Sequence, residues 1–135
     1  MRLFRIIIPV EDIGRALFFY TQVFQQQGER VSPGRHYLNC DGVTLALYDA
    51  AADGDPERPV PISEPLYFAT DDLEGAYRRC LEAGGRFPTD SPPDTGPLGH
   101  IWMRPWGERS FYVQDPFGNS LCFVDQDTAF QGISG

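Results

Sequence analysis

Positive charge is scarce in this sequence. Eleven Lys and Arg residues stand against nineteen Asp and Glu residues, which gives a net charge of -8 at pH 7. The positive residues form no basic run, and contacts to nucleic-acid phosphates need clustered Lys or Arg. The composition therefore argues against a nucleic-acid partner. An acidic surface keeps a protein in solution and mildly favours cationic small molecules through long-range attraction.

Long apolar stretches and a dense cysteine pattern are also missing. No hydrophobic run approaches the roughly 20 residues of a membrane-spanning helix. The first twelve residues, MRLFRIIIPVED, pass from apolar to acidic residues without a signal-peptide cleavage pattern. Cys40, Cys80 and Cys122 are odd in number and lack Cys-x-x-Cys spacing, which is typical of buried reduced thiols. We expect a cytoplasmic protein without a membrane partner.

Signatures of several common enzyme classes do not occur. The sequence contains no serine-hydrolase elbow, no P-loop and no dinucleotide-binding glycine pattern. Gly14 and the Gly84-Gly85 pair stand outside any phosphate-loop context. We therefore expect no nucleotide cofactor.

The most informative stretch is residues 104–125, RPWGERSFYVQDPFGNSLCFVD. Alternating aromatic and polar residues predict strands at 109–114 and 120–124. Between them, Asp115-Pro116-Phe117-Gly118-Asn119 supplies the residue types that a tight turn requires. Pro105-Trp106-Gly107 marks a second chain reversal just before this hairpin. With 135 residues and 41% hydrophobic residues, the chain suits one globular domain, residues 1–135.

Apolar spacing in the first third predicts a strand, a helix and three more strands. The apolar run 3–10 predicts the first strand. Apolar residues then recur at helical spacing, so we expect a helix that Asp12 caps and that runs to about Gln26, before Gly28. Three shorter strands are expected at 29–32, 35–40 and 43–49.

The same order of elements repeats after a linker. Residues 50–62 are rich in Pro, Asp and Ala and show no core-forming pattern. Beyond them we expect a strand at 64–70, a helix at 73–83, short strands at 86–89 and 100–104, a loop at 90–99 and a tail at 126–135. Val10-Glu11-Asp12-Ile13 corresponds to Thr70-Asp71-Asp72-Leu73. The repeat predicts two modules, at about 3–49 and 63–125.

The hairpin motifs resemble a known family. Pro-Trp-Gly, an Arg, aromatic strand residues and Asp-Pro-x-Gly-Asn are similar to the closing hairpin of the vicinal oxygen chelate superfamily. This superfamily includes glyoxalase I, extradiol dioxygenases, fosfomycin-resistance enzymes and bleomycin-resistance proteins, and the bleomycin-resistance branch is the most similar. The resemblance covers residues 3–125. It implies an α+β fold in which two tandem βαβββ modules form a curled mixed sheet around a central cavity. A ferredoxin-like α+β fold is the rival, but it does not need the second closing hairpin.

The resemblance also says where a metal would bind. Family ligands stand in the first strand, seven residues before the capping Asp, and in the last strand, four residues after the turn Gly. In this sequence these positions are occupied by Arg5, Pro65, Ala46 and Cys122. Arg stays protonated, Ala and Pro offer no donor, and one thiolate does not hold a divalent ion. We expect no metal, and therefore no metal-dependent activity.

Strand alternation predicts what lines the cavity instead. The four positions where family members carry metal ligands share a face with Ile7, Thr44, Tyr48, Tyr67 and Ser120. The opposite face should form the core: Ile6, Ile8, Leu45, Leu47, Leu66, Phe68, Leu121 and Phe123. The predicted ligand-binding residues are Arg5, Ile7, Tyr48, Tyr67, Trp102, Trp106 and Cys122.

Three polar side chains fall near the cavity without matching a ligand position. We expect His36 to be a partly exposed sheet residue and His100 to lie near the cavity mouth. Glu64 neighbours Pro65, so alternation directs it to the opposite face.

These features favour a binding protein over an enzyme. The expected function is metal-independent binding of a drug or aromatic metabolite, as in bleomycin resistance, with no cofactor and no catalytic residue. The resemblance implies a homodimer with cavities near the subunit interface. The alternatives are a lyase or dioxygenase of the same superfamily with an atypical active site, and a dimeric interaction module without a small ligand.

Overall fold

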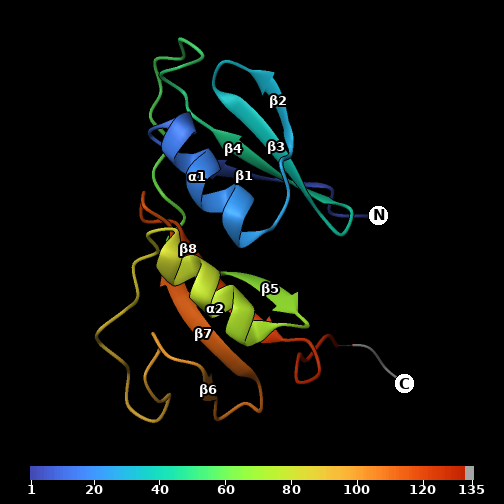
Figure 1. Cartoon of the computed structure of the whole chain (residues 1–135), viewed down its shortest axis with the longest axis vertical. Coiled ribbons are helices and arrows are strands. Elements are labelled where there is room, and N and C mark those ends of the chain that lie inside the picture. The colour runs from blue at the N-terminus through green and yellow to red at the C-terminus, as the bar shows by residue number, and fades with distance from the viewer. Residues whose placement is uncertain (133–135) are drawn as a thin grey trace.

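The computed structural model describes residues 1–132, which fold as two successive units with the same order of elements (Figure 1). The first unit comprises β1 (Arg5–Pro9), α1 (Ile13–Val23), β2 (Glu29–Ser32), β3 (Arg35–Cys40) and β4 (Val43–Tyr48). The second comprises β5 (Leu66–Thr70), α2 (Leu73–Glu82), β6 (Trp102–Met103), β7 (Arg109–Gln114) and β8 (Ser120–Asp125).

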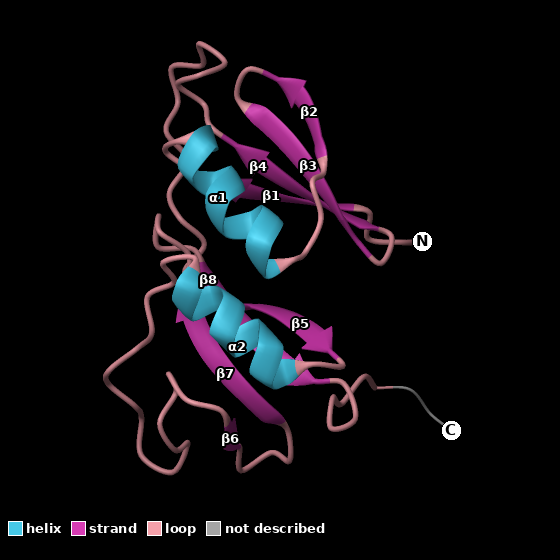
Figure 2. Cartoon of the chain, viewed as in Figure 1, coloured by secondary structure: helices cyan, strands magenta, loops and turns pink. Residues whose placement is uncertain are grey.

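Each unit forms its own four-stranded mixed sheet. The strand orders are β1-β4-β3-β2 and β5-β8-β7-β6. In each sheet the first strand of the unit runs parallel to the last, and the other pairs are antiparallel. The two helices lie side by side on the same side of the molecule (Figure 2). The predicted α+β fold with two tandem βαβββ modules is confirmed, and neither sheet closes into a barrel.

Both helices begin after a capping Asp, at Asp12 as predicted and at the corresponding Asp72. The Asp12 side chain accepts a hydrogen bond from the Arg15 backbone N at 3.1 Å, and Asp72 accepts one from Gly75 N at 3.0 Å. Such a cap stabilises a helix by about 1 kcal/mol because it satisfies an otherwise unpaired N–H group. The first helix ends at Val23, three residues earlier than predicted.

The strand predicted at 86–89 does not form. Arg86 alone pairs with Gln114, as an isolated bridge at the edge of β7. Pro88 has no N–H group to continue the ladder, and the chain leaves the sheet there. The strand predicted at 100–104 shrinks to the two residues of β6.

The helix-facing side of both sheets forms one shared core, as predicted. Ile8, Leu45, Leu47, Phe68, Leu121 and Phe123 are buried, and Ile6 and Leu66 pack against them. The Phe24 ring, just after α1, lies 5.0 Å from Phe68 and 5.9 Å from Phe123, both in the second sheet. The two units therefore share apolar contacts instead of folding around separate cores.

His36 belongs to this core side, which corrects its prediction as partly exposed. It pairs with Leu47 in the adjacent strand and is buried. Its Nε2 lies 2.7 Å from the Gln27 carbonyl oxygen, so a backbone partner makes the burial of a polar ring possible.

The three cysteines are free thiols. Cys80 and Cys122 are buried and Cys40 is partly buried, in agreement with the expectation of reduced cysteines. No helix within residues 1–132 is long and apolar enough to span a membrane.

Candidate functional site

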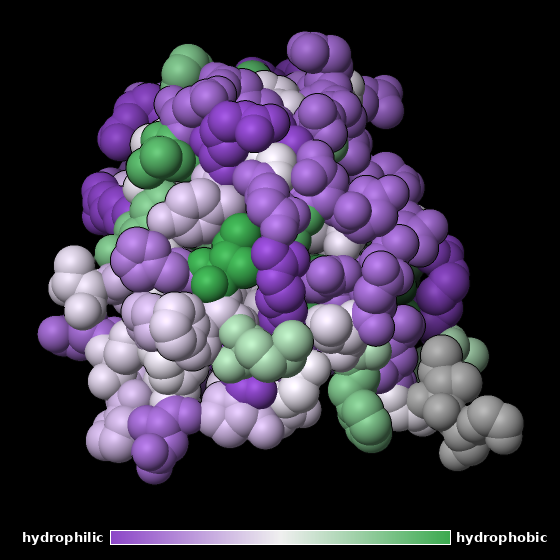
Figure 3. Space-filling model, turned by 60° about the horizontal axis from the view of Figure 1, so that its bottom comes forward, coloured by the Kyte–Doolittle hydropathy of each residue, from purple (hydrophilic) through white to green (hydrophobic). Residues whose placement is uncertain are grey.

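The candidate site comprises the two sheet faces that point away from the helices. Face A, on the first sheet, includes the cross-strand row Ile7, Ala46 and Tyr37. Face B, on the second sheet, includes the row Tyr67, Cys122 and Tyr112. Exposed apolar residues also form small patches framed by hydrophilic ones in the space-filling view (Figure 3).

Arg5 and Ile7 lie together on face A. Ile7 is 56% exposed while its neighbour Ile8 is buried, because successive side chains of a strand point to opposite faces. The Arg5 guanidinium carbon lies 5.2 Å from the Tyr37 ring centroid, within cation–π range. No carboxylate of residues 1–132 lies within ion-pair distance of Arg5. Its donors are therefore available to an anionic ligand group.

Tyr48 lies at the end of face A, and its hydroxyl group is hydrogen-bonded to the linker. Its hydroxyl donates to the Asp55 carboxylate, and this hydrogen bond raises the pKa of Tyr48. The Arg35 guanidinium lies 4.4 Å from the Tyr48 ring centroid and pairs with Asp53 at 2.6 Å. The ring is half-buried, and the linker occupies its hydroxyl.

Tyr67 and Cys122 occupy one row of face B. Tyr67 is 60% exposed, and its ring meets Tyr112 edge-on at 6.4 Å. Cys122 lies between them in the ladder and is fully buried. Burial raises the pKa of the Cys122 thiol to about 11, so it stays protonated at neutral pH. This thiol forms part of the floor, and in its protonated form it is a poor nucleophile and a poor metal ligand.

Trp102 lies at the border of face B, opposite Ser110 in the ladder, and is 51% exposed. Gly96 in the preceding loop approaches its indole so closely that a Cβ atom there would overlap the ring. Gly96 also has a φ of 74°, a region that favours glycine. The loop therefore supports one side of Trp102, and the other side is open.

Trp106 is held within the 105–107 turn region. Its Nε1 donates to Glu108 Oε1 at 3.0 Å, and Glu108 Oε2 accepts from the Phe130 backbone N at 2.8 Å. Trp106 is half exposed but is fastened to Glu108, which joins the turn to the C-terminal segment.

The residue that sequence reasoning missed is Arg104, which is buried within face B. Its guanidinium donates to the Ser110 hydroxyl at 3.0 Å and to backbone carbonyls of Thr95 (3.0 Å), Pro97 (3.1 Å), His100 (3.0 Å) and Ser110 (2.8 Å). No carboxylate of the described chain pairs with it. Arg104 thereby ties the loop that supports Trp102 to β7.

Arg104 also completes the floor of face B. Its guanidinium carbon lies 5.4 Å from the Tyr112 ring centroid. Burial lowers the pKa of Arg104, yet Arg remains charged in proteins. The only sequence signal for this role was an Arg directly before Pro-Trp-Gly, which says nothing about carbonyl partners.

A cavity of about 390 Å³ adjoins Tyr67. Its lining consists of Tyr67, Phe68, Ala69, Glu108, Val124, Ala129, Phe130 and Gln131. It contains no other predicted ligand-binding residue, and no residue of face A. A single chain therefore places Arg5 and Ile7 on one surface and Tyr67 on another.

His100 and Glu64 stay outside this cavity. Both are exposed, and the His100 carbonyl accepts from Arg104. His100 thus contributes through its backbone to the loop that Arg104 holds.

The residues at the four ligand positions of the family do not suit the divalent metal ion that the family resemblance implies. Arg5 is a cation, Ala46 and Pro65 have no side-chain donor, and Cys122 is a buried protonated thiol. Across residues 1–132, no three His, Cys, Asp or Glu side chains gather in a group that could hold a metal ion. No chemical step is therefore assigned to a metal.

Comparison with known proteins identifies the family and the fold. The family model of the Glyoxalase/Bleomycin resistance protein/Dioxygenase superfamily matches residues 2–123. No curated protein matches the chain in sequence. A superfamily member from Sphaerobacter thermophilus is 25% identical with a TM-score of 0.61, and 93% of this chain and 97% of that one are covered.

Two further solved structures share the fold. A glyoxalase-related enzyme from Fulvimarina pelagi is 20% identical with a TM-score of 0.67, over 93% of this chain and 88% of that one. The oxidase ChaP-H2 is 21% identical with a TM-score of 0.66, over 100% of this chain and 98% of that one.

Proposed function

Because the chain belongs to the glyoxalase/bleomycin resistance protein/dioxygenase superfamily, we propose that it is a metal-independent binding protein for a small drug or aromatic metabolite. The ligand lies on the open sheet faces, against Ile7, Tyr67 and Trp102. One observation carries this proposal: these side chains keep 56%, 60% and 51% of their surface exposed, in positions where a curled sheet offers a concave surface. Removing them from water is the main gain of binding.

A homodimer is the proposed binding state. Each four-stranded sheet exposes an edge and an apolar face, and Leu3, Phe4 and Met103 add further exposed apolar surface. A second copy of the chain that sets face A of one protomer beside face B of its partner covers this surface. It also brings Arg5 and the aromatic residues of face B to one cavity, which a single chain does not do.

Arg5 determines the orientation of a charged ligand. A planar ring stacks on Tyr67 and Trp102, and an anionic group meets the unpaired donors of Arg5. The net charge of -8 favours cations at long range, but salt screens that field beyond about 10 Å. At contact distance a charge-assisted hydrogen bond contributes about 1.5–3 kcal/mol. An anionic or neutral aromatic compound is therefore the preferred ligand.

We also propose that residues 1–135 act as one domain in the cytoplasm. The shared core, with Phe24 contacting the second sheet, supports a single domain. The three free cysteines support a reducing compartment.

The test uses two flat fluorescent probes, anionic 8-anilinonaphthalene-1-sulfonate and cationic ethidium. Trp102→Ala should raise the dissociation constant of both probes about threefold to tenfold, because a stacking partner is lost. Trp106→Ala is the matched control and should change it less. Arg5→Ala should weaken the anionic probe by about tenfold or more and leave ethidium unchanged or tighter. If Trp102→Ala and Tyr67→Ala both bind the probes like the parent protein, the site is elsewhere.

A further inference from the structure

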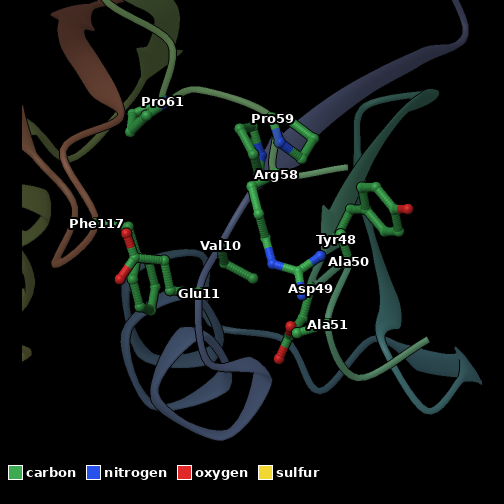
Figure 4. Close-up of a pocket in the computed structure, with 11 residues that line it drawn as sticks. Val10, Glu11, Tyr48, Asp49, Ala50, Ala51, Arg58, Pro59, Pro61 and Phe117 are labelled. Atoms are coloured by element: carbon green, nitrogen blue, oxygen red, sulfur yellow. The ribbon is translucent and has the colours of Figure 1, made fainter. Parts of the chain in front are cut away.

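A second cavity opens where β1 and β4 end, under the linker between the two units (Figure 4). Its volume is about 320 Å³, and its lining includes Val10, Glu11, Tyr48, Asp49, Arg58 and Phe117. Tyr48 is the one lining residue that also belongs to the predicted ligand-binding set. This cavity is distinct from the one beside Tyr67.

The walls of this cavity are largely apolar and preformed. Val10, Ala50 and Phe117 are buried side chains that line it. Pro59 and Pro61 belong to the linker that passes over it, and proline fixes the backbone φ angle. Binding here therefore costs little conformational entropy for ordering the cavity wall.

One cation and one anion of the lining are free to meet a ligand. Arg58 Nη1 donates to the backbone carbonyls of Asp55 and Glu57, and no carboxylate among residues 1–132 lies within ion-pair distance of it. Glu11 is exposed and forms no ion pair within the same residues. In Figure 4 the Arg58 side chain reaches across the cavity, with Glu11 and Phe117 on one side and Tyr48 on the other.

The third charged residue, Asp49, is already occupied by the backbone. Its Oδ2 accepts from Ile13 N and its Oδ1 accepts from Ala52 N, each at 3.2 Å. Ile13 is the first residue of α1, so this buried carboxylate interacts favourably with the partial positive charge at the N-terminus of the helix. It leaves Glu11 as the carboxylate that can receive a ligand cation.

We propose that this cavity binds a small zwitterion with an apolar body, namely a free α-amino acid with an aromatic or branched side chain. The ligand carboxylate meets Arg58, the ammonium group meets Glu11, and the side chain lies against Val10 and Phe117. A plain carboxylic acid lacks the contact with Glu11, and a plain amine lacks the contact with Arg58. The volume is at the lower end of the range for small-molecule sites. This site does not depend on the function proposed for the open faces.

Calorimetric titration with three related probes tests the proposal. L-phenylalanine carries both charges, 3-phenylpropanoate lacks the ammonium group, and 2-phenylethylamine lacks the carboxylate. L-phenylalanine should bind tightest, and each analogue should bind about tenfold or more weakly, because one charge-assisted contact is lost. Arg58→Gln and Glu11→Gln should each weaken L-phenylalanine to a similar degree.

Matched controls separate this site from surface charge and from the open faces. Arg78→Gln and Glu82→Gln make the same charge changes at exposed positions of α2 and should leave L-phenylalanine binding unchanged. Arg58→Gln should leave the binding of 8-anilinonaphthalene-1-sulfonate unchanged, since that probe belongs to the open faces. No binding of L-phenylalanine at millimolar concentration would overturn the proposal. Equal affinity of 3-phenylpropanoate, or equal affinity of Arg58→Gln and the parent, would overturn it too.

Discussion

At the residue scale, Arg104 is the least expected feature of the molecule. A buried cation usually has a carboxylate partner, yet here backbone carbonyls and one hydroxyl satisfy the guanidinium. Carbonyl partners leave no trace in the sequence, because every residue carries one. The same reason explains why His36 was expected to be partly exposed, since its partner is the Gln27 carbonyl.

Replacing Arg104 should destabilise the protein strongly. Arg104→Ala leaves several carbonyls without a donor and should cost about 3 kcal/mol in the free energy of unfolding. Arg104→Lys keeps the charge but not the planar fork and should recover only part of this loss. Urea unfolding measures both variants. The exposed Arg78→Ala is the control, and an Arg104→Ala midpoint equal to that of the control would contradict the structural role.

Asp53 should make stability depend on acid pH. Partial desolvation raises its pKa, but hydrogen bonds from Ser32, Gly34 and Arg35 outweigh this and lower the pKa below the usual 3.8. A lowered folded-state pKa means that its contribution is present above pH 3.8 and is lost as pH falls through the lower folded value.

Asp53→Asn is the corresponding test. At neutral pH the parent should have the larger free energy of unfolding. Its advantage over Asp53→Asn should shrink as pH falls below 3.8. A difference that stays constant or grows on acidification would show that the Asp53 carboxylate is not the cause.

At the element scale, the turn between β7 and β8 joins the two units. Asp115 Oδ2 accepts from the Tyr20 hydroxyl of α1 at 2.7 Å, and Asn119 Nδ2 donates to the Pro9 carbonyl of β1 at 2.7 Å. Asn119 Oδ1 accepts from Ile62 N of the linker at 2.8 Å. Asp115 and Asn119 are both fully buried. The turn is thus an internal joint between the units.

Tyr20→Phe should reveal this joint. The change removes only the hydroxyl, so a buried Asp115 oxygen loses one of its donors at a cost of about 1–3 kcal/mol. Tyr37→Phe, on the half-buried face A, is the matched control and should change the free energy of unfolding by less than about 0.5 kcal/mol. Equal urea midpoints for the two variants would argue against the joint.

Sequence pattern predicted these elements to different degrees. Strand alternation in residues 109–114 and turn chemistry in 115–119 are local signals, and both strands and the turn form as predicted. The same turn residues gave no sign that they would be buried, because their partners lie up to 110 positions away. The strand predicted at 86–89 does not form because Pro88 interrupts the ladder after Arg86.

At the scale of the whole molecule, the repeat in the sequence predicted the two βαβββ units, and the family model agrees. The repeat could not predict how faces A and B are placed, since that depends on packing between the units through Phe24 and the Asp115 turn. In one chain the two faces do not share the cavity beside Tyr67. A single cavity for the whole ligand set therefore rests on the proposed homodimer.

The homodimer should be visible in solution. Light scattering at micromolar concentration should give about twice the chain mass of 15.2 kDa. Ile7→Lys on the exposed part of face A should shift the equilibrium toward monomer, because a charge replaces buried apolar contact. Gln126→Lys, at an exposed position after β8, is a control outside both faces. A monomer across the whole concentration range would contradict the dimer and the shared cavity.

Metal-independent ligand binding is tested most directly by the dissociation constant of 8-anilinonaphthalene-1-sulfonate before and after treatment with a chelator. No set of donors for a divalent ion exists at the positions where family members carry metal ligands. In this chain those positions hold Arg5, Ala46, Pro65 and Cys122. The constant should therefore be the same in untreated protein, in chelator-treated protein, and after addition of nickel, zinc or manganese. If the chelator abolishes probe binding and one equivalent of metal restores it, ligand binding depends on a metal and the central claim is wrong.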